Sequence, residues 1–173
     1  MRRMRSVLIP IIAAPPVIAC GGETVEQEKH ATQIPNGLAV SGFRGCEDWQ
    51  TVAVSQAGER VEVILGNRAG IDAYRSCVPG NVTPFPDGAR MAKIHWRAER
   101  SEEATEPTTI PGTLNNIDFM LKDSKRLTNT SGWGYGQFND NATSDKLVPL
   151  GAGVDCGFAC HTLVNSRDYV FMA

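Results

Sequence analysis

Alternation of apolar and polar residues is the clearest pattern along this chain. In residues 89–98 the two kinds of residue fall on opposite sides: Ala92, Ile94, Trp96 and Ala98 on one, Met91, Lys93, His95 and Arg97 on the other. A period of two predicts a β-strand with one buried face. Runs rich in β-branched and aromatic residues, bounded by turn-forming residues, predict four more strands, at 51–55, 60–65, 116–122 and 133–138.

Short connections separate these strands. A helix is predicted over 67–76, with Asn67 as its N-cap, and prolines and glycines mark turns at 79–80 and 84–88. Residues 101–113 and 140–149 are polar and contain proline, so we expect loops there. Strands joined by hairpins and loops, without regular βαβ units, predict an α+β fold: a mainly antiparallel β-sheet with a few short helices.

The N-terminus has the pattern of an export signal. Three arginines precede an uncharged apolar run over 7–19, and Val-Ile-Ala leads directly into Cys20. This resembles the lipobox of bacterial lipoproteins, in which cleavage occurs before the cysteine and its thiol is acylated. We expect a lipoprotein signal peptide at 1–19, a flexible tether at 20–33 and one domain at 34–173. The alternative is ordinary secretion, with Cys20 lost in the discarded peptide.

Composition and charge exclude several classes of protein. The 173 residues are 42% hydrophobic and 21% charged, which is ordinary for one globular domain. The net charge is -2, and cleavage would remove three of the 17 basic residues, so we do not expect the chain to bind nucleic acid through phosphate contacts. No apolar run reaches the roughly 18 residues of a membrane-spanning helix. We therefore expect a periplasm-facing lipoprotein that contacts the membrane through its lipid anchor only.

The chain has five cysteines, which point to its candidate chemistry, and Cys20 is one of them. Export would place Cys46 and Cys77 in an oxidising compartment, where a disulfide is the simplest outcome; two buried free thiols are the alternative. Cys156 and Cys160 lie close together, and His161 follows directly.

Residues 156–161, Cys-Gly-Phe-Ala-Cys-His, are similar to the Cys-x-x-Cys-His signature of c-type haem attachment. In that chemistry two thiols bond to the haem and the histidine ligates its iron. Here three residues separate the cysteines, and we expect Gly157 to absorb the extra residue through unusual backbone dihedrals. The alternatives are a local disulfide or part of a zinc site. Zinc needs four ligands, and the other histidines are His30 and His95.

Four segments together resemble the cytochrome P-460 family, which includes cytochrome c-prime-beta. They are VEVILGNRAGIDAY at 61–74, PFPDGARMAKIHW at 84–96, FMLKDSKRLTNTSGWGYGQF at 119–138 and CGFACHTLVNSRDYVF at 156–171. The resemblance implies a mainly antiparallel domain with one covalent haem c, often in a homodimer. Carried over to this chain, Cys156 and Cys160 bind the haem covalently. His161 ligates the iron, whose sixth position stays open or weakly occupied.

The resemblance also singles out Lys93. In hydroxylamine-oxidising members a lysine at the matching position bonds to the macrocycle, which would make Lys93 both catalytic and cofactor-binding. The alternative is a strand lysine without that bond, as in cytochromes of the c-prime-beta type. A carboxylate base is expected shortly before the haem motif, but residues 147–154 contain none.

A distal pocket without that base would suit a neutral gas. Five apolar or aromatic residues are candidates to line it, although each is equally compatible with ordinary core: Phe85, Met91, Phe119, Trp133 and Tyr135. Gly134 and Gly136 would let a strand approach the ring closely, unless they simply bend it.

Three functions follow. The first is a haem-dependent hydroxylamine oxidoreductase, which passes electrons to a partner cytochrome. The second is a non-enzymatic haem protein that binds nitric oxide or transfers electrons. The third, from another class, is a haem-free exported binding domain with its cysteines in disulfides.

Overall fold

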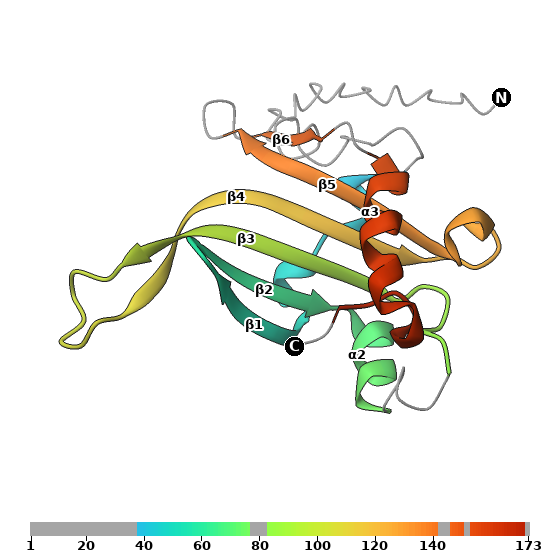
Figure 1. The fold of residues 1–173 in the computed structure, drawn as a ribbon, viewed down its shortest axis with the longest axis horizontal. Helices are drawn as coiled ribbons and strands as arrows, with labels where there is room; N and C mark the ends of the chain where they lie inside the picture. The colour runs from blue at the N-terminus through green and yellow to red at the C-terminus, as the bar shows by residue number, and fades with distance from the viewer. Residues whose placement is uncertain (1–37, 77–82, 142–145, 151–152, 172–173) are drawn as a thin grey trace, which may run out of the picture.

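One antiparallel sheet organises the domain (Figure 1). The computed structural model describes residues 38–76, 83–141, 146–150 and 153–171. In these ranges the strand order is β1-β2-β3-β4-β5-β6, so each strand pairs with its neighbours in sequence. The strands are β1 (Gln50–Ala57), β2 (Arg60–Gly66), β3 (Arg90–Arg100), β4 (Thr109–Lys122), β5 (Trp133–Asn141) and β6 (Lys146–Pro149). The prediction of a mainly antiparallel α+β fold is confirmed.

Short helices decorate this sheet. They are α2 (Arg68–Arg75), α3 (Gly153–His161) and the 3-10 segments η1 (Val40–Phe43), η2 (Cys46–Asp48), η3 (Thr128–Thr130) and η4 (Thr162–Arg167). The predicted cap of α2 is confirmed, because the Asn67 side chain accepts a hydrogen bond from Gly70 N at 3.0 Å. None of the helices in the described ranges is long and apolar enough to cross a membrane.

Two segments that we expected to be loops contain strands. Residues 109–113 belong to β4, where they extend with β3 into a hairpin arm that projects beyond the rest of the sheet (Figure 1). The arm is largely solvated on both faces, so its sequence carries no apolar alternation. Residues 146–149 form β6, an edge strand too short to show a period, although Leu147 is buried.

The helix α3 was also not predicted. Its apolar and small residues are spread around the helix and do not gather in one stripe, so the sequence gives no helical period. In the structure α3 packs on β5 and crosses one face of the sheet (Figure 1).

The sheet separates two hydrophobic clusters. The cluster on the side of α3 consists of Ala73, Phe85, Ala89, Met91, Met120, Trp133, Tyr135 and Val170. The cluster on the opposite face consists of Leu38, Val40, Phe43, Ala92, Phe119, Phe138 and Leu147. Met91 and Ala92 fall in different clusters, as the alternation in β3 predicted. The ring of Phe43 from η1 stacks on Phe119 with centroids 4.1 Å apart, which covers the face opposite α3.

Candidate functional site

A cavity of about 470 Å³ lies between α3 and the sheet. This volume is within the range of small-molecule and cofactor sites. The sheet contributes Ile64, Met91, Lys93, Asp118, Phe119, Met120, Tyr135, Gly136 and Gln137 to its wall. The other side is formed by Leu150, Gly157, Cys160, His161, Val170 and Phe171. Most of the wall is apolar, with a few charged or polar groups converging on it.

Three of the predicted site residues meet at this cavity. Lys93 reaches it from β3, while Cys160 and His161 reach it from the last turn of α3. Cys156 belongs to the same helix, but its side chain lies outside the described part of the chain. The structure therefore brings together residues that are far apart in sequence.

His161 is held so that one ring nitrogen remains for a ligand. Its Nδ1 lies 2.6 Å from the carbonyl oxygen of Tyr169, to which it donates a hydrogen bond. That bond leaves Nε2 as the nitrogen with an available lone pair. Burial lowers the pKa of His161, the charge of Lys93 lowers it further, and the Tyr169 carbonyl and Asp118 offset only part of this. The ring is therefore neutral at pH 7, the form that binds a metal.

Aromatic rings hold the imidazole from two sides. The ring of Tyr135 lies with its centroid 4.8 Å from that of His161, and the ring of Phe171 meets His161 edge-on at 4.9 Å. Tyr135 also has a buried hydroxyl without a hydrogen-bond partner among the described residues, and burial raises the pKa of this phenol. A buried polar atom without a partner is uncommon in folded proteins, and here it belongs to a residue that lines the cavity.

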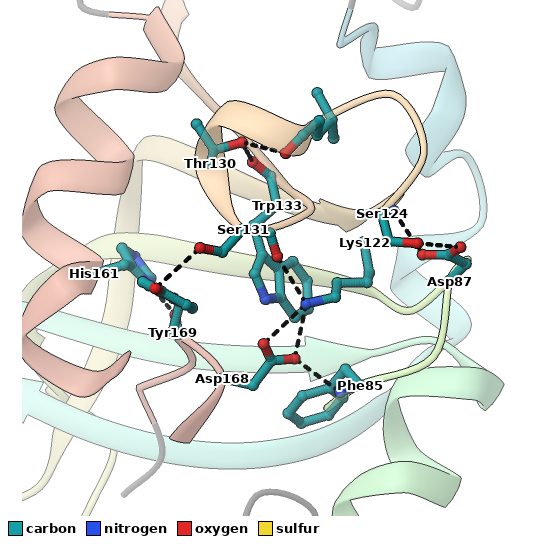
Figure 2. A network of polar contacts seen from close by, with 11 residues as sticks. Phe85, Asp87, Lys122, Ser124, Thr130, Ser131, Trp133, His161, Asp168 and Tyr169 are labelled. Carbon is teal, nitrogen blue, oxygen red and sulfur yellow. Dashed lines mark hydrogen bonds and ion pairs between the residues drawn. The ribbon is translucent and has the colours of Figure 1, made fainter. Parts of the chain in front are cut away.

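The carbonyl that holds His161 belongs to a turn after η4. Asp168 and Tyr169 both have positive φ angles, 49° and 64°. The Asp168 carboxylate accepts hydrogen bonds from Lys122 Nζ at 2.9 and 3.0 Å and from Phe85 N at 2.8 Å (Figure 2). Lys122 is buried and its Nζ lies 4.9 Å from the centroid of the Trp133 ring.

A charged network continues from the cavity into the sheet. Lys93 Nζ forms an ion pair with Glu62 Oε2 at 2.7 Å. His95 bridges two carboxylates, with Nδ1 3.0 Å from Glu62 Oε1 and Nε2 2.9 Å from Asp118 Oδ2. Asp118 also accepts from Asn116 Nδ2 at 3.0 Å. Burial raises the pKa of Glu62, but hydrogen bonds and charges from Lys93 and His95 outweigh it, and the net pKa is lowered.

Sequence reasoning missed Glu62 and Asp118. A carboxylate was expected within residues 147–154, before the haem motif, whereas the carboxylate at the cavity wall is Asp118 of β4. The signal that could have found it is strand register: Lys93 pairs with Asp118, and Glu62 pairs with His95. Once the pairing of the strands is known, alternation places all four of these side chains on the same face of the sheet as Met91.

Gly157 serves a different purpose from the one expected. It lies inside α3 and is not among the residues with positive φ, so it absorbs no extra residue through unusual dihedrals. A Cβ atom at Gly157 would instead lie 2.6 Å from Tyr135 Cβ and 2.8 Å from Tyr135 Cγ. The glycine allows α3 to lie directly against β5.

The predicted pocket-lining residues divide into two groups. Met91 and Tyr135 line the cavity, and Phe119 borders it although its ring stacks on Phe43 in the opposite cluster. Phe85 and Trp133 do not line it; they pack edge to face in the core, with centroids 5.8 Å apart. Of the two predicted close-approach glycines, Gly136 borders the cavity, whereas Gly134 faces Leu38 and Leu127.

The remaining cysteine predictions fall partly beyond the described ranges. Cys46 is half-buried in η2, while Cys20 and Cys77 lie outside the described residues. The Cys46–Cys77 disulfide, the lipidation of Cys20, the signal peptide and the tether therefore stay predictions. Where side chains are described, no group of three or more His, Cys, Asp or Glu could hold a metal ion. The zinc alternative includes Cys156, whose side chain lies outside that part of the chain, so it stays an untested alternative.

The comparison with protein families decides the identity of the domain. The family model for cytochrome P-460 matches residues 42–172, which is most of the chain. The chain belongs to the cytochrome P-460 family. The resemblance seen in four segments of the sequence is thus confirmed. No curated protein is matched by the chain.

Membership of the cytochrome P-460 family implies a haem cofactor. The residues at the cavity fit such a group on three counts. The wall is largely apolar, His161 is neutral with Nε2 available, and Cys160 lies beside it. In this cytochrome P-460 domain the cavity between α3 and the sheet is the site that suits the cofactor.

Proposed function

We propose that this chain is an exported c-type monohaem cytochrome that binds or oxidises small nitrogen compounds, hydroxylamine or nitric oxide. The observation that carries the proposal is the geometry of His161. It directly follows Cys160 at the wall of the cavity, and its Nδ1 donates to the Tyr169 carbonyl. An imidazole oriented in this way presents Nε2 to an iron, and the hydrogen bond at Nδ1 raises its basicity as a ligand.

The spacing of the cysteines is compatible with covalent attachment. Cys156 and Cys160 are four positions apart in one helix, and helical positions i and i+4 share a face. The extra residue of the spacer is thus accommodated by a regular helical turn. Haem c bound through both thiols and ligated by His161 is the cofactor that these residues support.

The cofactor would supply an open coordination position and a one-electron redox couple. The chain's own residues decide what happens around it. The apolar wall from Ile64, Met91, Met120 and Val170 excludes water and favours small neutral molecules. Electrons would leave to a partner cytochrome.

The network at the wall favours oxidation of hydroxylamine, because removing electrons from N–H and O–H groups also releases protons. Two contacts join Glu62 to His95 and His95 to Asp118, and each needs one proton to be a hydrogen bond. The three groups therefore share two protons when both contacts are made. Asp118 lines the cavity and could accept a substrate proton in the way a general base does.

The second candidate, a non-enzymatic protein that binds nitric oxide, is favoured by the contact of Lys93. Its Nζ lies 2.7 Å from Glu62 Oε2. A bond from Lys93 to the macrocycle would require Nζ to leave Glu62. A lysine that stays on Glu62 would resemble the unlinked type of the family.

The first test is an absorption spectrum and an intact mass of the protein made with c-haem maturation machinery. Covalent haem in the wild type supports the proposal, and its absence overturns it in favour of a haem-free binding domain. Cys160→Ser should lose one thioether bond and His161→Ala should lose the proximal ligand. Cys46→Ser, a cysteine in the opposite cluster, is the matched control and should keep both.

The same experiment separates the two activities. A strongly red-shifted ferrous Soret band with a mass deficit of a few hydrogens means that Lys93 is bonded to the ring, and Lys93→Ala should abolish both signs. Hydroxylamine turnover with an acceptor cytochrome should then be measured. An ordinary Soret band with tight nitric oxide binding and no turnover supports the gas-binding function.

The proposal also includes the location of the protein. We propose lipidation at Cys20 after removal of residues 1–19, and periplasm-facing attachment through the lipid. Labelling with a radioactive fatty acid should mark the wild type and fail for Cys20→Ala, which would be secreted or retained unlipidated. Sedimentation of the purified domain tests for the homodimer implied by the family.

A further inference from the structure

The turn that holds His161 is in a conformation that needs support. Asp168 and Tyr169 are consecutive residues with positive φ, 49° and 64°, and neither is a glycine. Left-handed backbone at two adjacent residues with side chains is uncommon and persists where the surrounding contacts impose it. The Tyr169 carbonyl, which accepts from His161 Nδ1, belongs to the second of these residues.

A buried ion pair supplies the first support. Lys122 Nζ donates to both carboxylate oxygens of Asp168, at 2.9 and 3.0 Å. The side chains are 5% exposed for Lys122 and 12% for Asp168. Lys122 is anchored further by its hydrogen bond to the Ser131 carbonyl at 3.1 Å and by the Trp133 ring. Asp168 thereby connects the turn to β4, the centre of the sheet (Figure 2).

A second set of contacts holds Tyr169 itself. The Ser131 hydroxyl donates to the phenolic oxygen of Tyr169 at 2.9 Å, and the Tyr169 ring lies against Phe158 of α3 with centroids 5.3 Å apart. Ser131 thus contacts both Lys122 and Tyr169. The turn is held from three directions, by β4, by the residues before β5 and by the Phe85 backbone (Figure 2).

We propose that Lys122 and Asp168 are positioning residues that hold the Tyr169 carbonyl against Nδ1 of His161, and so set the orientation and basicity of the imidazole toward the haem iron. The inference rests on the proposed function, in which His161 is the iron ligand. Neither Lys122 nor Asp168 lines the cavity. Both act on His161 through the Tyr169 carbonyl, which accepts the hydrogen bond from Nδ1. Neither residue needs to touch the haem.

The test uses Asp168→Asn, Lys122→Met and the double variant in the full chain. Three quantities are measured: the reduction potential, the iron–histidine stretching frequency of the ferrous protein, and the exchange of the His161 Nδ1 proton by nitrogen-15 NMR. Weaker donation from Nδ1 makes the imidazole a poorer donor to iron. We expect the potential to rise, the stretching frequency to fall and proton exchange to accelerate about tenfold in all three variants.

The double variant distinguishes positioning from simple stabilisation. Each single variant leaves a buried charge without its partner, whereas the double variant leaves none, so the double variant should recover part of the lost stability. The double variant does not restore the ion pair that holds the turn, however, so the potential, the stretching frequency and the proton exchange should remain altered. Phe138→Leu, in the opposite cluster, is the control: it should lower stability and leave the His161 signals unchanged.

The outcome that overturns the proposal is loss of stability with an unchanged potential, stretching frequency and proton exchange. Recovery of these signals together with stability in the double variant would overturn it as well. If the wild type carries no haem, the proposed function fails separately. The Nδ1 proton exchange of the same variants still tests whether Lys122 and Asp168 hold the His161 contact.

Discussion

Replacement of Gly157 by alanine should push α3 away from the sheet. The new Cβ would lie 2.6 Å from Tyr135 Cβ, an atom attached directly to the backbone of β5 that cannot move aside alone. Ordinary contact begins near 3.4 Å, so the two elements must separate by about 0.8 Å. His161 lies one helical turn further along and would be displaced with the helix, away from the Tyr169 carbonyl at 2.6 Å.

The expected loss of stability is the difference of two effects. Overpacking against a rigid neighbour costs about 3 kcal/mol at the upper end of its usual range. Alanine is favoured over glycine inside a helix by about 1 kcal/mol. Gly157→Ala should therefore lower the free energy of unfolding by about 2 kcal/mol, and the His161 Nδ1 proton should exchange faster.

Chemical denaturation with two controls checks this value. Ala159→Gly, at an exposed position of the same helix, measures the helix propensity alone and should cost about 1 kcal/mol. Gly42→Ala, where a Cβ meets nothing within 4 Å, should change stability by less than about 0.5 kcal/mol. A Gly157→Ala protein that is more stable than the wild type would refute the close approach of α3 and β5.

Three further predictions concern the cap, the charged network and the proposed base. Asn67→Ala should lower the free energy of unfolding by about 2 kcal/mol by denaturation, because its side chain also accepts from Arg90 N and donates to Gly88 O. Glu62→Gln should lower the free energy of unfolding by about 2 kcal/mol at pH 7. The folded pKa of Glu62 lies below its ordinary 4.5, so the stabilisation from its charge is present above that value and is lost as the pH falls through the folded pKa. The free energies of unfolding of the wild type and Glu62→Gln should therefore converge in acid. A difference that does not change with pH would contradict this. Asp118→Asn should slow hydroxylamine oxidation about 100-fold and leave nitric oxide binding unchanged, and equal rates would remove Asp118 from the proton path.

Local patterns predicted the parts of the fold that local physics determines. The alternation over Met91 and Ala92 predicted which side chains lie on each face of β3, and Asn67 was identified as a cap from its position alone. The arm formed by β3 and β4 was not predicted, because a strand that is solvated on both faces has no apolar period. The helix α3 was not predicted, because its apolar residues do not form a stripe along one side of the helix.

The site was predictable where its residues are adjacent in sequence. Cys160 and His161 form a motif that a reader of the sequence can find. Asp118 and Glu62 reach the site through cross-strand pairing, and Asp168 acts through Lys122 of a distant strand. Such contacts depend on register and on the path of the chain after η4, neither of which a single sequence displays.

The two clusters on opposite faces of the sheet allow the shape of the cavity and the stability of the domain to change separately. Packing around Phe43, Phe119 and Phe138 contributes to stability from the face that α3 does not cover. Changes at Met91 or Tyr135 alter the shape of the cavity without entering that packing. A substitution that reshapes the cavity therefore leaves the opposite cluster, and the stability that it contributes, in place.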